Sequence, residues 1–211
     1  MNIRLIASAA TLLFATASQA ALTNGGFESP VLAANNWYPV ASIPGWSASP
    51  TGANIEVWVQ PFSGVAAYEG NQFVELNSNV ASTIYQDVGS VAGQSVGYAF
   101  AHRGRTGVDT MRFTATDLGT DNMFGTADDT VLVTRTVSDG TSAWGAYADR
   151  GFITSGNNIR LSFTAVNPLG SVGNFLDAVR FDTSVPEPAG LALVGLGLVG
   201  IGLSRRRKQQ A

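Results

Sequence analysis

The stretch DTMRFTATD, at residues 109–117, decides the fold class of this chain. Apolar and polar side chains alternate along it, and several are β-branched or aromatic, which is typical of a half-buried β-strand. A segment rich in Gly, Asn and Asp follows it, which indicates a turn. The stretch therefore predicts a strand.

Segments of the same kind recur on both sides of this stretch, between Gly, Asn and Ser residues. No segment between them has a helical period over ten residues. This pattern predicts an all-β fold, an antiparallel β-sandwich of the jelly-roll type. The other predicted strands are NIEVWVQ (54–60), NQFVELN (71–77), STIYQDV (82–88), SVGYAFAHR (95–103), DTVLVTRTV (129–137), NIRLSFTAV (158–166) and NFLDAVRFD (174–182).

The two ends of the chain differ from this body and predict export. A basic start at residues 1–4, an apolar run at residues 5–17 and the small residues Ser18 and Ala20 predict a signal helix that signal peptidase removes after Ala20. A buried N-terminal helix is the alternative, but the run has no amphipathic face for docking. Residues 1–20 are therefore read as a signal peptide.

Near the other end, residues 189–203 carry no charge and would span about 22 Å as a helix, less than the ~30 Å hydrocarbon core of a bilayer. This predicts a short transmembrane helix and a marginal anchor in the inner membrane. The cations that follow should stop transfer and stay cytoplasmic, so that the residues before Pro186 face the periplasm. These cations are Arg205, Arg206, Arg207 and Lys208.

Pro186, Glu187 and Pro188, the short apolar segment and the terminal cations together resemble the PEP-CTERM sorting signal, at residues 185–211. The resemblance implies that a membrane-embedded exosortase recognises the Pro-Glu-Pro motif and removes the tail after export. It also implies a final location at the cell surface or in the extracellular matrix. A permanent single-span anchor is the alternative.

The part between the two signals, residues 21–184, has the length of one domain. It holds seven arginines, no lysine and fourteen acidic residues, a formal net charge of −7. Nucleic acid is therefore excluded as an expected partner, because binding a phosphate backbone needs a clustered cationic face. The chain has no cysteine, which excludes disulfides, thiolate metal sites and cysteine-based catalysis.

The opening TNGGFESP (23–30) and the closing GNFLDAVRFD (173–182) resemble the first and last strands of galactose-binding-like jelly rolls among carbohydrate-binding modules. In this resemblance Glu28 and Asp177 share a structural calcium ion, and backbone carbonyls near Asn24 and Glu69 complete the oxygen shell. The alternative is that Glu28 caps a turn and Asp177 pairs with an arginine such as Arg180.

A second calcium candidate is the loop DLGTDNMFGTADDT, at residues 117–130. Asp117, Asp121 and Asp128 stand at positions 1, 5 and 12 of an incomplete EF-hand pattern. A third oxygen side chain and the turn glycine are missing, so the pattern predicts weak binding. A solvated acidic hairpin loop is the alternative.

Candidate ligand-binding residues are Arg103 and Arg105, which alternate after a strand and can offer forked donors to sugar hydroxyls or carboxylates. Pairing with the surplus acids of the domain is the alternative. Trp144 follows a turn and is predicted to be an exposed stacking platform, whereas Trp46 and Trp58 are predicted to be core. The remaining stacking candidates are Trp37, Tyr68, Tyr85 and Tyr147.

Three functions follow from these observations. The first is a non-catalytic surface or matrix β-sandwich that binds a glycan or exopolysaccharide. The second is a structural or adhesive matrix protein that calcium stabilises and that has no small ligand. The third is a hydrolase, which would need paired carboxylates such as Glu56 and Glu75 at a definite separation. Because nothing in their spacing singles out that pair, the sequence predicts no enzyme and no organic cofactor.

Overall fold

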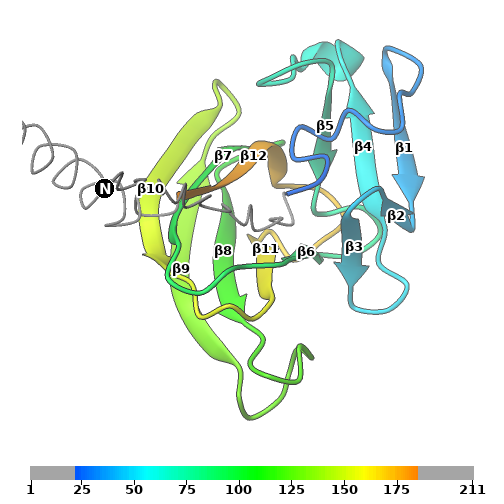
Figure 1. Ribbon diagram of the computed structural model, residues 1–211. Helices are drawn as coiled ribbons and strands as arrows, with labels where there is room; N and C mark the ends of the chain where they lie inside the picture. The colour runs from blue at the N-terminus through cyan, green and yellow to red at the C-terminus, as the bar shows by residue number, and fades with distance from the viewer. Residues whose placement is uncertain (1–21, 185–211) are drawn as a thin grey trace, which may run out of the picture.

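The computed structural model describes residues 22–184, which form a β-sandwich with one 3-10 turn, η1 (Phe62–Gly64) (Figure 1). The predicted signal helix and the predicted transmembrane helix lie outside these residues. The strands are β1 (Asn36–Val40), β2 (Ser42–Ile43), β3 (Trp46–Ser49), β4 (Ile55–Val59), β5 (Gln72–Glu75), β6 (Thr83–Val88), β7 (Ser95–Arg103), β8 (Asp109–Asp117), β9 (Thr130–Asp139), β10 (Gly145–Ile153), β11 (Ile159–Asn167) and β12 (Phe175–Ser184).

The strands form two six-stranded sheets, and every neighbouring pair is antiparallel. Sheet A has the order β1-β4-β5-β12-β7-β10 and sheet B the order β2-β3-β6-β11-β8-β9. Among consecutive strands of residues 22–184, only β2–β3, β4–β5 and β8–β9 stay within one sheet, and every other connection passes to the opposite sheet. The prediction of an all-β antiparallel sandwich is confirmed.

The main core lies between the two sheets, and β8 shows how the sequence builds it. Met111, Phe113 and Ala115 are fully buried and pack in this core. The residues between them face the other way, because successive side chains of a strand point to opposite faces. Trp46, 1% exposed, joins the same core through contacts with Phe27 and Phe163.

All eight predicted strands are present, with ends that shift by one or two residues, but four strands were missed. β1 contains Pro39, β2 has two residues, β3 has four, and β10 is mostly exposed, so none carries a long apolar alternation. These four strands form because they pair with neighbouring strands of the two sheets. β1, for example, pairs along its whole length with β4.

The opening segment, read as a first strand, forms no strand, which corrects that part of the prediction. Asn24 and Phe27 have positive φ angles of 54° and 57°, which break an extended conformation. The segment nevertheless lies against β12, because the Gly25 carbonyl accepts the Val179 N–H at 2.8 Å. A Cβ atom at Gly25 would lie 2.0 Å from the Val179 oxygen, so this approach requires glycine.

Within residues 22–184, no helix has the length and apolar character needed to cross a membrane.

Candidate functional site

The outer face of sheet B holds a groove of about 460 Å³. Three rows of outward-facing side chains cross sheet B here, because residues that stand opposite each other on paired strands share a face. From β6 through β11 and β8 to β9, row one is Thr83, Thr164, Arg112 and Thr136, row two is Tyr85, Ser162, Thr114 and Thr134, and row three is Asp87, Arg160, Thr116 and Val131. All members of these rows except Asp87, Thr134 and Thr136 line the groove.

Alternation along each strand creates these rows. Between the outward Thr114 and Thr116 of β8 lies Ala115, and between Ser162 and Thr164 of β11 lies Phe163, both fully buried in the main core. The core residues fix the strands, and the hydroxyl-bearing residues are left on the outer face. Ser49 of β3 and two residues of the β8–β9 connection, Phe124 and Asp129, also line the groove.

Most hydroxyl groups of the groove are available to a ligand. The Thr83 and Thr164 hydroxyls bond to each other at 2.9 Å. The hydroxyls of Thr114, Thr116 and Ser162 form no hydrogen bond with any residue that the structure describes. Each hydroxyl can donate one hydrogen bond and accept others, so the floor offers several unused donors and acceptors.

One end of the groove holds a fixed cation between two aromatic rings. The Arg160 guanidinium lies 4.1 Å from the centre of the Tyr85 ring and 4.6 Å from that of Phe124. Its Nε and Nη2 donate to the two Asp87 carboxylate oxygens at 2.6 and 2.7 Å. These hydrogen bonds raise the pKa of Arg160 further above its ordinary value, so the group stays charged.

The β8–β9 connection brings a carboxylate to this same end. Asp129 Oδ2 accepts the Gly125 N–H at 2.6 Å. Its other oxygen, Oδ1, is buried and has no hydrogen-bond partner among residues 22–184. Arg160 and Asp129 thus place both signs of charge at the row-three end of the groove.

Part of the outer face of sheet A, over β4, β5 and the start of β12, is covered in contrast by a second apolar cluster. Trp58, Phe73 and Phe175 are at most 2% exposed, and Trp144 packs edge-on against Phe73. The segment around η1 contributes Phe62, whose ring centre lies 4.9 Å from that of Trp58. This aromatic cluster leaves β4 and β5 buried on both faces.

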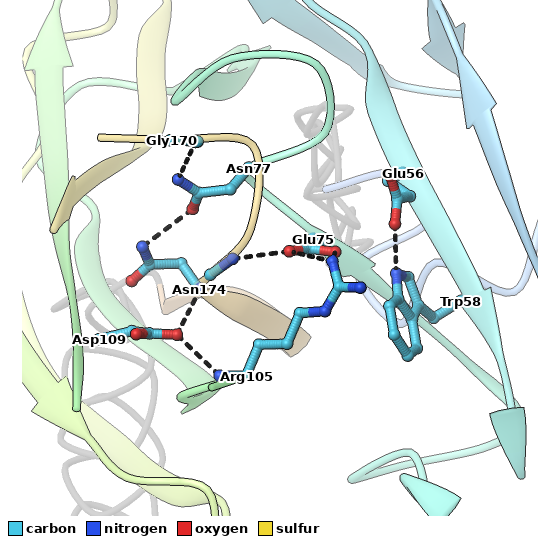
Figure 2. Close-up of polar contacts among 9 residues, drawn as sticks. Glu56, Trp58, Glu75, Asn77, Arg105, Asp109, Gly170 and Asn174 are labelled. Carbon is cyan, nitrogen blue, oxygen red and sulfur yellow. Dashed lines mark hydrogen bonds and ion pairs between the residues drawn. The ribbon is translucent and has the colours of Figure 1, made fainter. Parts of the chain in front are cut away.

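A buried ion pair adjoins the aromatic cluster (Figure 2). The Arg105 guanidinium donates through Nη1 to both Glu75 oxygens, at 2.9 and 2.8 Å, and lies 4.7 Å from the centre of the Trp58 ring. Gly173 N–H donates to Glu75 Oε1 at 2.7 Å. Burial raises the pKa of Glu75 to about 8, against the opposing effect of these hydrogen bonds.

Glu56 stands directly opposite Glu75 in the pairing of β4 with β5. Its Oε1 accepts the Trp58 indole N–H at 2.8 Å, as Figure 2 shows. The two carboxyl groups are 5% and 0% exposed, so neither is open to solvent. The pair therefore belongs to the packed outer layer of sheet A.

Further amides and acids tie the loops at this end of the sandwich together (Figure 2). Asp109 Oδ2 accepts the backbone N–H groups of Arg105 and Asn174, at 2.7 and 3.1 Å. The Asn174 side chain donates to Asn77, which donates in turn to the carbonyl of Gly170. These contacts join the β7–β8, β11–β12 and β5–β6 connections.

His102, the single histidine of the chain, is fully buried in the same region. Its two ring nitrogens lie 2.7 Å from Asp139 Oδ2 and 3.0 Å from Asn174 Oδ1. Tyr147 O–H donates to Asp139 at 2.7 Å, and burial followed by this hydrogen bond raises the pKa of Tyr147 to about 12. Both ring nitrogens of His102 and the Tyr147 hydroxyl are thus held by hydrogen bonds within the fold.

The three predicted ligand-binding residues lie here and not in the groove. Arg105 forms an ion pair with Glu75, so it has the alternative role of pairing with an acid of the domain. Arg103 is half-buried and donates to the Thr141 carbonyl at 2.5 Å. Trp144 is no exposed platform, because its ring packs in the aromatic cluster and its indole N–H donates to the Ala66 carbonyl at 2.9 Å.

Glu28 and Asp177, the first predicted calcium ligands, both hold the segment between η1 and β5. Glu28 Oε1 accepts the N–H groups of Asn71 and Gln72, at 2.7 and 2.8 Å. Asp177 Oδ2 accepts those of Tyr68 and Glu69, at 2.9 and 3.0 Å. The structure thus brings the two carboxylates to the same segment.

The donor set fits calcium in part. Burial, and to a smaller extent the nearby Glu28 charge, raise the pKa of Asp177 to about 7. A cation bound between the two carboxylates would favour the charged form of Asp177 and lower this pKa. The expected carbonyl of Asn24 is used, because it accepts the Trp46 indole N–H at 3.0 Å. Arg180 pairs with Glu69 and not with Asp177.

The second set of predicted ligands, Asp117, Asp121 and Asp128, does not converge. Asp117 is 6% exposed and accepts hydrogen bonds from Gly119, Ser155 and Asn157. Burial is the largest single effect and raises the pKa of Asp117, but the three hydrogen bonds together lower it by more. The pKa of Asp117 therefore lies below its ordinary value. Asp121 and Asp128 accept hydrogen bonds from residues of their own loop.

No group of three or more acidic or histidine side chains in residues 22–184 is arranged to hold a metal ion. Calcium therefore stays a prediction at both places.

The groove itself was missed by reasoning from sequence, although Tyr85 was among the stacking candidates. A usable signal is present in β8 and β11, where Thr110, Thr114 and Thr116 on one strand and Ser162 and Thr164 on the other repeat at a spacing of two or four. Hydroxyl groups at that period share one face of a strand. The pairing of β8 with β11, which lie about fifty residues apart, then joins the two sets.

Comparison with known proteins gives separate results for the tail and for the body. Residues 184–208 match the PEP-CTERM protein-sorting motif, as the sequence predicted. No curated protein matches the chain in sequence.

The body is similar in structure to the carbohydrate-binding module TmCBM61, solved in complex with β-1,4-galactotriose, with a TM-score of 0.51, 18% identity and coverage of 79% of this chain and 100% of that one. It is also similar to the Stig cyclase Fisc from Fischerella sp. TAU, with a TM-score of 0.58, 17% identity and coverage of 82% and 100%. A second cyclase from the same organism has a TM-score of 0.57, 18% identity and coverage of 81% and 100%. At these identities the likeness shows the fold alone, a jelly-roll sandwich.

Proposed function

We propose that this chain is an exported, non-catalytic glycan-binding protein, and that the groove on sheet B holds the glycan. The observation that carries the proposal is the set of unpartnered hydroxyls of Thr114, Thr116 and Ser162 in a groove beside Tyr85. Sugar recognition needs many hydrogen-bonding groups beside an apolar surface, and this floor offers both. A length of polysaccharide could lie across the three rows.

The likeness to a carbohydrate-binding module supports the same reading at the level of fold, because such modules carry sugar ligands on this scaffold. Fold alone does not exclude catalysis, since two neighbours are cyclases. The absence of catalysis is proposed from Glu56 and Glu75, the carboxylate pair a hydrolase would need. Both are buried and hydrogen-bonded within the fold, with no opening for a substrate.

The sorting motif supports the cellular part of the proposal. A tail of this kind implies an exported protein that passes through the membrane. We propose that Pro186, Glu187 and Pro188 are read by an exosortase, that the chain is held briefly in the inner membrane with its body in the periplasm, and that the body is then released to the cell surface or matrix. The mass of the secreted protein tests this step, because loss of residues after the motif lowers it measurably.

A panel of neutral and charged glycans tests the groove. Thr114→Val should weaken binding several-fold, because it removes one hydrogen bond of about 1 kcal/mol. Thr134→Val is the matched control: Thr134 lies in the same row and on the same face, but does not line the groove. Absence of binding to every glycan, or equal effects of the two variants, would contradict the proposal and favour a structural matrix role.

A further inference from the structure

Arg112 lies on the groove floor without a charge partner. It is exposed, in row one of β8, and its guanidinium makes no hydrogen bond or ion pair with residues 22–184. Its cross-strand neighbours are Thr164 on β11 and Thr136 on β9. Rows one and two contain no acidic side chain.

Such an arginine is unexpected in this domain, where acids outnumber arginines two to one. Arg105, Arg160 and Arg180 are each paired with a carboxylate, and Arg103 and Arg135 donate to backbone carbonyls. Arg150, on the outer strand β10 of sheet A, shares with Arg112 the lack of a side-chain partner among the described residues. Arg112 differs from it in lying inside the groove.

The charged groups that face the groove divide it into two ends. Arg160, with its partner Asp87, and Asp129 lie at the row-three end. Arg112 lies two rows away, about 13 Å along β8 at ~3.3 Å per residue. An anion at row three would meet the Asp129 carboxylate, whereas an anion at row one would meet a guanidinium with hydroxyls on both sides.

We propose that the groove binds an acidic glycan, and that Arg112 receives the oxyanion group of one of its sugars, a carboxylate or a sulfate. This inference rests on the proposed glycan-binding function and names its ligand class. A guanidinium presents two parallel N–H donors that match the two oxygens of such a group. The neighbouring threonine hydroxyls then bind the ring hydroxyls of the same sugar.

The overall charge of the domain makes local recognition necessary. With a formal net charge of −7, the body repels a polyanion at long range. Binding of an acidic glycan must therefore come from direct contact at Arg112, because long-range electrostatic attraction would not produce it. This separates a built site from the general attraction that a basic protein would show.

The experiment measures binding of the purified full chain to two matched polymer pairs. Polygalacturonate is compared with its carboxyl-reduced product, and dextran sulfate with dextran. We expect the chain to bind one acidic polymer at least about tenfold more tightly than its neutral partner. The polymer that is bound identifies the oxyanion as carboxylate or sulfate.

Arg112→Gln should abolish this preference, whereas Arg150→Gln should retain it. Both variants remove one positive charge from an exposed arginine without a partner, so they change the net charge equally. Melting temperatures of the two variants within about 1 °C of the parent show that folding is unchanged, since exposed substitutions cost little.

Two results would overturn the inference. Neutral polymers bound as tightly as acidic ones would leave the glycan-binding proposal standing and remove the acidic ligand class. Equal losses in the Arg112 and Arg150 variants would mean that net charge, and not the groove, decides binding. Failure to bind any polymer in these pairs or in the glycan panel would instead remove the proposed function itself.

Discussion

The outer faces of the two sheets differ, because side chains cover part of one face and a groove lies on the other. On sheet A, the segment around η1 and Trp144 cover Trp58, Phe73 and Phe175, and the face becomes a second core. On sheet B, Phe124 and Asp129 of the β8–β9 connection lie at the row-three end, and a groove remains over the rows. The two faces therefore differ in the loops and side chains that pack over them.

The comparison teaches that an outer face can be recognised by what occupies its alternate positions. β4 places Glu56 and Trp58 outward, and both are buried with their polar atoms bonded to each other. β8 places Arg112, which is exposed, and Thr114, which is half-buried, outward, and neither side chain bonds to a described residue. Buried polar atoms need hydrogen-bond partners within the fold, whereas polar atoms on an open face can bond to water or to a ligand.

The largest effect is expected from Phe175→Ala in the aromatic cluster. Phe175 is fully buried, so its loss should lower the free energy of unfolding by about 3–5 kcal/mol through lost burial and a cavity. Phe124→Ala, the same change at a side chain 56% exposed in the groove, should cost less than about 1 kcal/mol. Urea denaturation measures both, and equal losses would contradict the contrast between the two faces.

A smaller loss, about 3 kcal/mol at pH 9, is expected from Arg105→Met, because it leaves the charged Glu75 buried without its cation. The loss should shrink at pH 6, since the raised pKa of Glu75, about 8, lets the carboxyl hold its proton there. Denaturation at the two pH values measures the difference. A loss that does not depend on pH would contradict this account of Glu75.

The double variant with Glu75→Leu and Arg105→Met serves as the control for that experiment. Replacing both partners by apolar groups leaves no buried charge, so stability should recover most of the loss. The parent itself should become less stable as pH rises from about 4.5 to about 8, because the native state holds a proton on Glu75 that the unfolded state has released. Glu75→Gln should reduce that slope and leave the part that comes from Asp177, whose pKa is raised to about 7.

Calcium is expected to have a moderate effect at Glu28 and Asp177, on the sheet A side. At one hundred times its dissociation constant, a bound ion would stabilise the fold by about 2.7 kcal/mol. Thermal melting with calcium and with a chelator measures this for the parent, for Asp177→Asn and for Asp182→Asn, an exposed acid on the same strand. A melting temperature that calcium leaves unchanged in all three would rule out the predicted ion.

The smallest effect on stability is expected in the groove. Thr114→Val and Thr116→Val should each change the free energy of unfolding by less than about 0.5 kcal/mol, because no described residue loses a hydrogen bond. The same variants should lower glycan affinity. A stability loss of 2 kcal/mol or more would mean that these hydroxyls serve the fold and not a ligand.

Sequence alone determined the class of the fold and the sorting signals. Alternation in residues such as Met111, Phe113 and Ala115 reports a buried face directly, because the period of two is a local property of a strand. The Pro-Glu-Pro tail is likewise a contiguous motif, so it needs no folding to be recognised.

The tertiary structure decided which face is open and which polar residues meet. Arg105 was predicted to bind a ligand, but in the fold its Nη1 donates to both carboxylate oxygens of Glu75, thirty residues away. Trp144 looked exposed until the segment holding Ala66 covered it. Contacts of this kind join strands and loops far apart in the chain, and they depend on sheet order and register, which side-chain alternation within a single strand does not encode.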